Sequence, residues 1–137
     1  MIHGLDHLAI AVSDLEAAVT YWTTHLHAEV VHRETVAAQR VEVVMLRIGE
    51  LSIELLRPTS EDSPVAKFIA TRGPGLHHVA LRADSTESEL SRLRAAGARL
   101  IDEHARPGAA GTQVGFIHPK TLGGVLVELV EHSVHGS

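Results

Sequence analysis

The chain has 137 residues, about the size of one ordinary domain, and carries 12 Lys and Arg against 17 Asp and Glu, a net charge of −5. This acidic balance argues against a protein that binds a phosphate backbone, and the small number of aromatic residues argues against platforms for stacking bases. There is no cysteine and no apolar run long enough to span a membrane, so we expect a cytoplasmic protein without nucleic-acid or membrane partners.

The first half of the chain predicts one strand, one helix and three further strands. Residues 5–12 alternate in polarity as a half-buried strand does, and Ser13-Asp14 offers a cap before a run with helical spacing that begins at Leu15. We expect this helix to end near His25. Runs of β-branched or alternating residues then predict strands at 28–35, 41–48 and 51–57.

The second half repeats this order. The predicted elements are a strand at 76–83, a helix over 85–96 that Gly97 ends, and strands near 99–103, 113–118 and 124–131. The order βαβββ therefore occurs twice, which predicts an α+β fold. We expect a single domain over residues 1–137, with module one at about 1–70 and module two at about 75–137.

Alignment of the two halves supports the duplication. The segment beginning His7-Leu-Ala-Ile aligns with His78-Val-Ala-Leu at an offset of 78 minus 7, or 71. Glu54, in Leu-Ser-Ile-Glu-Leu-Leu, aligns with Glu128, in Val-Leu-Val-Glu-Leu-Val, at an offset of 128 minus 54, or 74. Because both offsets are close to half of the chain, two similar modules are the simplest organisation.

Each module places one histidine and one glutamate on strands of this pattern. Neighbouring residues of a strand point to opposite faces of the sheet. Glu54 and Glu128 each lie between two apolar residues, and His7 and His78 are each followed by one. The apolar neighbours suit a face covered by a helix. We therefore expect four side chains to line the surface that the two modules enclose: His7, Glu54, His78 and Glu128.

Two imidazoles and two carboxylates form a ligand set that suits a divalent transition ion in octahedral geometry with two positions left open. The two carboxylates would neutralise the dication, which offsets the cost of placing glutamates among apolar strand residues. Ligand type alone does not separate Co, Mn, Ni, Zn and Mg, so all five are candidates for the ion.

Several segments resemble the vicinal oxygen chelate superfamily and, within it, the methylmalonyl-CoA epimerase family. The most specific are Gly-Leu-His-His, which ends at His78, and His-Pro-Lys, which ends at Lys120. Asp6-His7-Leu-Ala, Glu54-Leu-Leu-Arg-Pro and the segment that ends at Glu128 are similar as well, so the resemblance covers essentially the whole chain. It implies that the two modules form a cup-shaped mixed sheet around a metal ion.

The resemblance implies a metal-dependent epimerase that inverts C2 of methylmalonyl-CoA by removing a proton from one face and returning one to the other. By position, it implies His7, Glu54, His78 and Glu128 as metal ligands, and Glu128 and Glu42 as the acid–base groups. Position 54 is glutamine in some relatives. Relatives are commonly homodimers, so we expect a homodimer here.

The acyl-CoA partner leaves a weaker signal. Lys120 and the loop at residues 108–112 can approach the phosphates or the pantetheine arm, since lysine offers a point charge and glycine allows close approach of the backbone. A hairpin loop with a solvated lysine explains the same residues at least as well.

Three other functions stay open at this point. A glyoxalase I type lyase, acting on a glutathione hemithioacetal, shares the His, Glu, His, Glu set. An iron extradiol dioxygenase uses two histidines and one carboxylate, so the fourth ligand counts against it. A non-catalytic ligand-binding member of the same fold is the third alternative, although such proteins usually lack the ligand set.

Overall fold

A computed structural model describes residues 1–133, so the last four residues of the expected domain, 134–137, lie outside the described residues. The chain divides into two units. The N-terminal unit is His7–His77, and the C-terminal unit combines Met1–Asp6 with the chain from residue 78 onward. The expected boundary between the modules is close to the observed one, except that the first six residues group with the second module. That both units form one domain stays a prediction.

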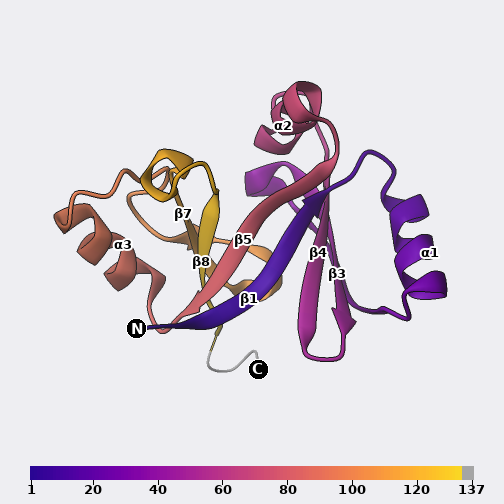
Figure 1. Ribbon diagram of the computed structural model, residues 1–137, viewed down its shortest axis with the longest axis horizontal. Helices are drawn as coiled ribbons and strands as arrows, with labels where there is room; N and C mark the ends of the chain where they lie inside the picture. Colours follow the sequence, from indigo (N-terminus) through magenta and orange to yellow (C-terminus); the bar gives the residue numbers. More distant parts are fainter. Residues whose placement is uncertain (134–137) are drawn as a thin grey trace. The chain divides into compact units, whose positions relative to one another are not determined.

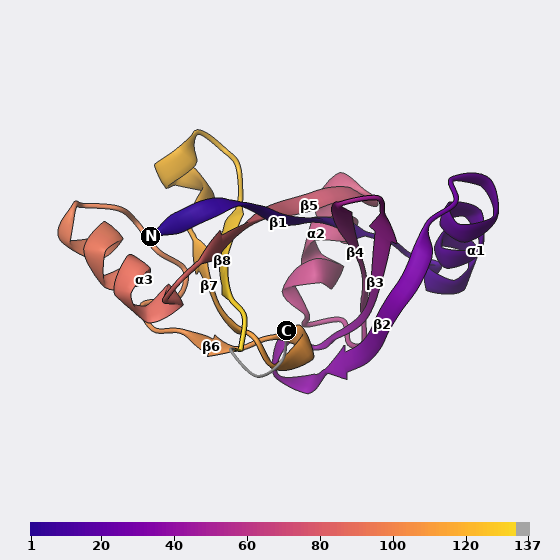
Figure 2. The same cartoon turned by 90° about the horizontal axis from the view of Figure 1, so that it is seen from below.

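The N-terminal unit has the hydrogen-bonded strand order β2-β3-β4-β1. Strand β1 runs parallel to β4, whereas β3 is antiparallel to both β2 and β4. Helix α1 packs beside β4, and Figure 2 shows β2 as the outer strand next to β3. The elements are β1 (Ile2–Ala11, shared by both units), α1 (Leu15–His25), β2 (Glu29–Val36), the short η1 (Ala37–Gln39), β3 (Val41–Ile48), β4 (Leu51–Pro58) and α2 (Pro64–Arg72).

The C-terminal unit repeats this plan with the order β5-β8-β7-β6. Its first strand is again parallel to its last, and the neighbouring pairs are antiparallel. The predicted α+β architecture with the order βαβββ occurring twice in a mixed sheet is confirmed (Figure 1). The elements are β5 (Gly75–Ala83), α3 (Thr86–Ala95), β6 (Arg106–Pro107), η2 (Ala109–Gly111), β7 (Gln113–Ile117), η3 (Pro119–Leu122) and β8 (Val127–Glu131).

Each unit buries its own apolar layer between a helix and the strands. In the N-terminal unit, Leu15 and Val19 of α1 join a core that includes Ile53 and Leu55 of β4. In the C-terminal unit, Leu90 of α3 packs with both apolar neighbours of Glu128. Among residues 1–133, no helix combines the length and the apolar character needed to cross a membrane.

The two predicted helices begin where their caps place them. The Asp14 carboxylate accepts a hydrogen bond from the Ala17 amide at 3.0 Å, and the Ser85 hydroxyl accepts one from the Ser88 amide at 3.1 Å. A third helix, α2, was not predicted. Its signal is nevertheless present in the sequence, since Ser63 caps the helix and Pro64 occupies its first turn.

Two predicted strands of the second module are wrong in extent. No strand forms at 99–103, where only Leu100 makes an isolated bridge, and β6 lies further on at Arg106–Pro107. The reason is that Asp102 uses its carboxylate, rather than a strand ladder, to accept the Phe116 amide at 2.8 Å. The last strand begins at residue 127 instead of 124, because two glycines with positive φ, Gly123 and Gly124, precede it.

A glutamate of helix α3, Glu89, makes the stability of the fold depend on pH. Glu89 is nearly buried and accepts two hydrogen bonds from the Arg92 guanidinium, at 3.0 and 2.6 Å. The hydrogen bonding of Arg92 lowers the pKa of Glu89. A carboxyl whose pKa falls on folding adds stability above its unfolded pKa, and this stability disappears as the pH falls through the folded pKa.

We therefore expect Glu89→Gln to lower the free energy of unfolding by about 1 kcal/mol at pH 7. The difference from wild type should shrink towards zero as the pH falls below about 4. Urea unfolding at several pH values measures it, with the exposed Glu103→Gln as a control that should follow wild type. A difference that stays constant between pH 7 and pH 3 would contradict the assignment.

Candidate active site

The N-terminal unit buries a histidine and a glutamate on adjacent strands. Ala9 of β1 is the register partner of Glu54 on β4, and His7 lies two residues before Ala9 on the same face. The His7 Nε2 and Glu54 Oε2 atoms are 3.6 Å apart, and both side chains are buried. Glu54 points to this face because its two neighbours pack into the core beneath α1.

The C-terminal unit repeats this construction. Ala80 of β5 is the register partner of Glu128 on β8, and His78 again lies two residues earlier. The His78 Nε2 and Glu128 Oε1 atoms are 3.3 Å apart, and both side chains are buried. The parity predicted for all four residues is therefore found in each unit taken by itself.

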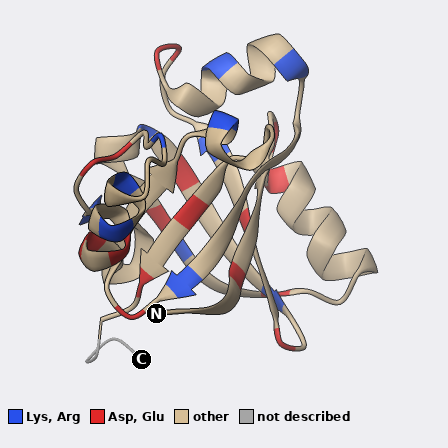
Figure 3. Ribbon diagram, turned by 60° about the vertical axis from the view of Figure 1, so that its left-hand side comes forward, with Lys and Arg blue, Asp and Glu red and all other residues tan. Residues whose placement is uncertain are grey.

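These pairs offer the donor chemistry of a metal site. A buried carboxylate is costly unless a charge or hydrogen bonds compensate it, and each unit buries one beside an imidazole nitrogen. Figure 3 shows acidic residues within strands of the sheet as well as at helices and loops. Imidazole nitrogen and carboxylate oxygen are ligands for Mn, Co, Ni and Zn, so each pair fits part of the coordination shell of a divalent ion.

Glu42, the second predicted acid–base group, does not share the strand face of Glu54. Met45, three residues further along β3, is the register partner of Glu54, so Glu42 lies on the opposite face of the strand. There it pairs with Arg57, whose Nε and Nη2 donate to Glu42 Oε1 at 3.1 and 2.6 Å. The carboxylate is thus already paired on the α1 side of the sheet.

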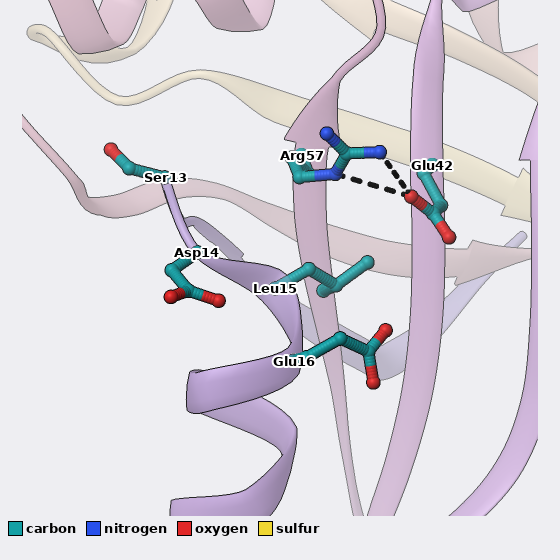
Figure 4. A pocket seen from close by; sticks show the side chains of 6 residues that line it. All are labelled: Ser13, Asp14, Leu15, Glu16, Glu42 and Arg57. Carbon is teal, nitrogen blue, oxygen red and sulfur yellow. Dashed lines mark hydrogen bonds and ion pairs between the residues drawn. The ribbon is translucent and has the colours of Figure 1, made fainter.

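The surroundings of Glu42 agree with this position (Figure 4). Glu42 and Arg57 line an open hollow of about 340 Å³ together with residues at the start of α1, namely Ser13, Asp14, Leu15 and Glu16. The face of β3 that carries the partner of Glu54 instead presents Val41, Val43 and Met45, which are apolar. On this side of the N-terminal unit, β3 supplies no acid–base group.

Lys120 lies in η3, and its side chain is exposed. The preceding turn is ordered by His118, whose Nδ1 accepts the Lys120 amide at 3.1 Å. The loop at 108–112, which precedes β7 whereas η3 follows it, needs its first glycine, because a Cβ on Gly108 would lie 2.7 Å from Val114 Cγ1. Lys120 and this loop therefore lie at opposite ends of β7.

A sequence model of the Glyoxalase/Bleomycin resistance protein/Dioxygenase superfamily matches residues 6–116. The ethylmalonyl-CoA/methylmalonyl-CoA epimerase of Cereibacter sphaeroides is 39% identical over 131 residues, which cover 94% of this chain and 98% of that protein. The chain belongs to the methylmalonyl-CoA epimerase family of this superfamily. Members of the superfamily bind divalent metal ions, and the donor set described above fits such an ion.

Solved structures of the methylmalonyl-CoA epimerase family share the fold. The crystal structure of the Mycobacterium tuberculosis methylmalonyl-CoA epimerase has a TM-score of 0.93 and 40% identity, covering 98% of this chain and 91% of that one. A variant of the Streptomyces coelicolor methylmalonyl-CoA epimerase, in complex with 2-nitronate-propionyl-CoA, has a TM-score of 0.94 and 34% identity over 98% and 97% of the chains. The predicted glyoxalase or vicinal oxygen chelate fold is confirmed.

Proposed function

We propose that this chain is a metal-dependent epimerase that inverts C2 of methylmalonyl-CoA. The observation that carries the proposal is the duplicated buried pair in a member of this family. In each unit, a histidine stands two residues before the register partner of a glutamate: Ala9 pairs with Glu54, and Ala80 pairs with Glu128. Because burial of an uncompensated carboxylate is costly, its repetition at equivalent positions of both units favours a functional role over a structural one.

The four side chains of the two pairs, His7, Glu54, His78 and Glu128, are the proposed ligands of one divalent ion. Co, Mn, Ni, Zn and Mg are all candidates. A thioester α-proton is weakly acidic, and a bound ion supplies a Lewis acid for the negative charge that develops on the thioester oxygen. The role of the protein is to fix the ligands before the reaction begins.

Inversion needs an acid–base group on each face of the planar carbon. Glu128 is the proposed group on one face. Because Glu42 points away from the ligand face of β3, we assign the other face to Glu54, the remaining buried carboxylate of the proposed ligand set. Each module then contributes one carboxylate, which removes the proton on its side or returns one from it.

The acyl-CoA substrate needs a cation for its phosphates as well as a site for its reacting end. Lys120 is the proposed contact, supported by its exposure and by its place in the His-Pro-Lys segment. We also propose that the protein is a homodimer and that it works in the cytoplasm. The absence of cysteine favours a reducing compartment such as the cytoplasm. Sedimentation equilibrium of the purified protein measures its oligomeric state.

Deuterium wash-in tests the function directly. We expect single-epimer methylmalonyl-CoA to be inverted in D2O with deuterium appearing at C2, as followed by proton NMR. Removal of divalent ions with a chelator should lower the rate by about a thousandfold, since Lewis-acid stabilisation is worth several kcal/mol. Addition of one of the five candidate ions should restore it.

The same assays separate the alternatives. Turnover of methylglyoxal with glutathione, without exchange at C2 of methylmalonyl-CoA, would indicate a lyase. Absence of both activities in a protein that binds no divalent ion would indicate a ligand-binding module. Inversion that persists at full rate after chelation would overturn the metal-dependent mechanism.

A further inference from the structure

Phe116 of β7 contacts the proposed metal ligands of the C-terminal unit. It is the register partner of Glu128 on β8, so the two side chains share one face of the sheet. Its ring lies nearly perpendicular to the imidazole of His78, with the ring centroids 5.1 Å apart and an interplanar angle of 89°. A buried perpendicular ring at this distance restricts rotation of the imidazole.

The position of the Phe116 ring is itself supported by Arg106. The guanidinium carbon of Arg106 lies 5.7 Å from the centroid of the ring, within the range of a cation–π contact. Arg106 is the register partner of Val114, which clusters with Ala80 and Val130. Arg106 therefore lies on the same face of the unit as the two proposed ligands.

Asp102 joins these parts. One of its carboxylate oxygens lies 3.1 Å from Arg106 Nε, and the other accepts the backbone amide of Phe116 at 2.8 Å. The side chain of Asp102 is largely buried, at 16% exposure, which favours a fixed geometry over a transient surface pair. A single carboxylate thus anchors both the backbone of Phe116 and the cation that lies against its ring.

We propose that Asp102, Arg106 and Phe116 are positioning residues that hold the His78 imidazole in the orientation needed for metal binding. This inference rests on the proposed function, because it takes His78 as a ligand. A metal-binding imidazole is normally oriented by a neighbouring group, and loss of such support weakens metal affinity. Here the support comes from an aromatic ring that an ion pair holds in place.

The first test uses the metal-free protein, so it does not depend on activity. Proton signals of the His78 ring, assigned by their loss in His78→Ala, should carry a ring-current shift from Phe116. We expect Phe116→Leu to remove this shift and Arg106→Met to reduce it. Arg99→Met, an exposed arginine of the same unit, is the matched control and should leave the shift at its wild-type value.

The second test measures the dissociation constant for Co²⁺ by competition with a chelator. Phe116→Leu and Arg106→Met should each weaken binding about three- to tenfold, the worth of one aromatic contact. In the double variant, Arg106→Met should add little, because its effect passes through the ring of Phe116. Arg99→Met should bind as wild type does.

Two results would overturn the proposal. One is an unchanged His78 signal in Arg106→Met. The other is a loss of Co²⁺ affinity in Arg106→Met that remains undiminished in the background of Phe116→Leu. If Phe116→Leu does not fold, the comparison of Arg106→Met with Arg99→Met in both assays still decides the question. Wild-type protein that binds none of the five candidate ions would contradict the proposed function, while the ring-current assay still tests the positioning.

Discussion

Replacement of Glu128 by glutamine is expected to lower the rate of inversion by about a hundred- to ten-thousandfold, the usual contribution of a positioned acid–base group. Glutamine keeps an oxygen donor and nearly the same volume, and Glu128 is buried between core residues of β8. The substitution therefore removes the charge and the proton transfer with little change in packing. The measurement is kcat for single-epimer methylmalonyl-CoA, with thermal unfolding to verify the fold.

The matched control is the same substitution at Glu42. Because Glu42 is paired with Arg57 on the face of β3 opposite the register partner of Glu54, we expect Glu42→Gln to invert the substrate at close to the wild-type rate. A loss in Glu42→Gln as large as that in Glu128→Gln would show that Glu42 is an acid–base group of the reaction. A Glu128→Gln variant with full activity would show that Glu128 is not an acid–base group in this enzyme.

The duplicated pairs could be predicted from the sequence because two independent signals agree. The repeat aligns His7 with His78 and Glu54 with Glu128, and the apolar residues of the same strands, on the opposite parity, then determine which face each takes. Strand parity needs only the local sequence when the neighbouring residues are strongly apolar. The same buried arrangement in both units follows from this local pattern.

The strand face that Glu42 takes, by contrast, is not determined by its local sequence. In β3, apolar residues occupy both faces, since Val43 and Val44 are adjacent and both are buried, so local alternation does not separate the faces. The missing signal was the hairpin register. A two-residue turn, Gly49-Glu50, follows Ile48 and places Leu51 opposite it, so the partner of Glu54 is Met45 and Glu42 falls on the other face.

The misplaced strand near residue 100 has a different physical origin. The backbone amides of Ile101 and Asp102 both donate hydrogen bonds to the Phe116 carbonyl, at 2.9 and 3.2 Å. In return, the Asp102 carboxylate accepts a hydrogen bond from the Phe116 amide. A side chain thus replaces one bond of a regular ladder. The pattern of apolar residues does not reveal this hydrogen bond, because its two partners are 14 positions apart in the sequence.

Glu54→Gln is the second variant with a large expected effect, and it separates proton transfer from metal binding. Glutamine keeps an oxygen donor at position 54, so the variant is expected to retain the ion. If Glu54 serves one face of C2, inversion should fall about a hundred- to ten-thousandfold. Exchange should nevertheless persist for the epimer whose α-proton faces Glu128, because that proton transfer remains intact.

The measurement is deuterium incorporation from D2O into each purified epimer, together with metal content by elemental analysis. The expected pattern is rapid wash-in without inversion for one epimer and slow wash-in for the other, at an unchanged ratio of metal to protein. Equal loss of exchange for both epimers, with loss of metal, would assign Glu54 to coordination alone. Inversion at the wild-type rate would remove Glu54 from the reaction and leave the second face to a group outside the buried pairs.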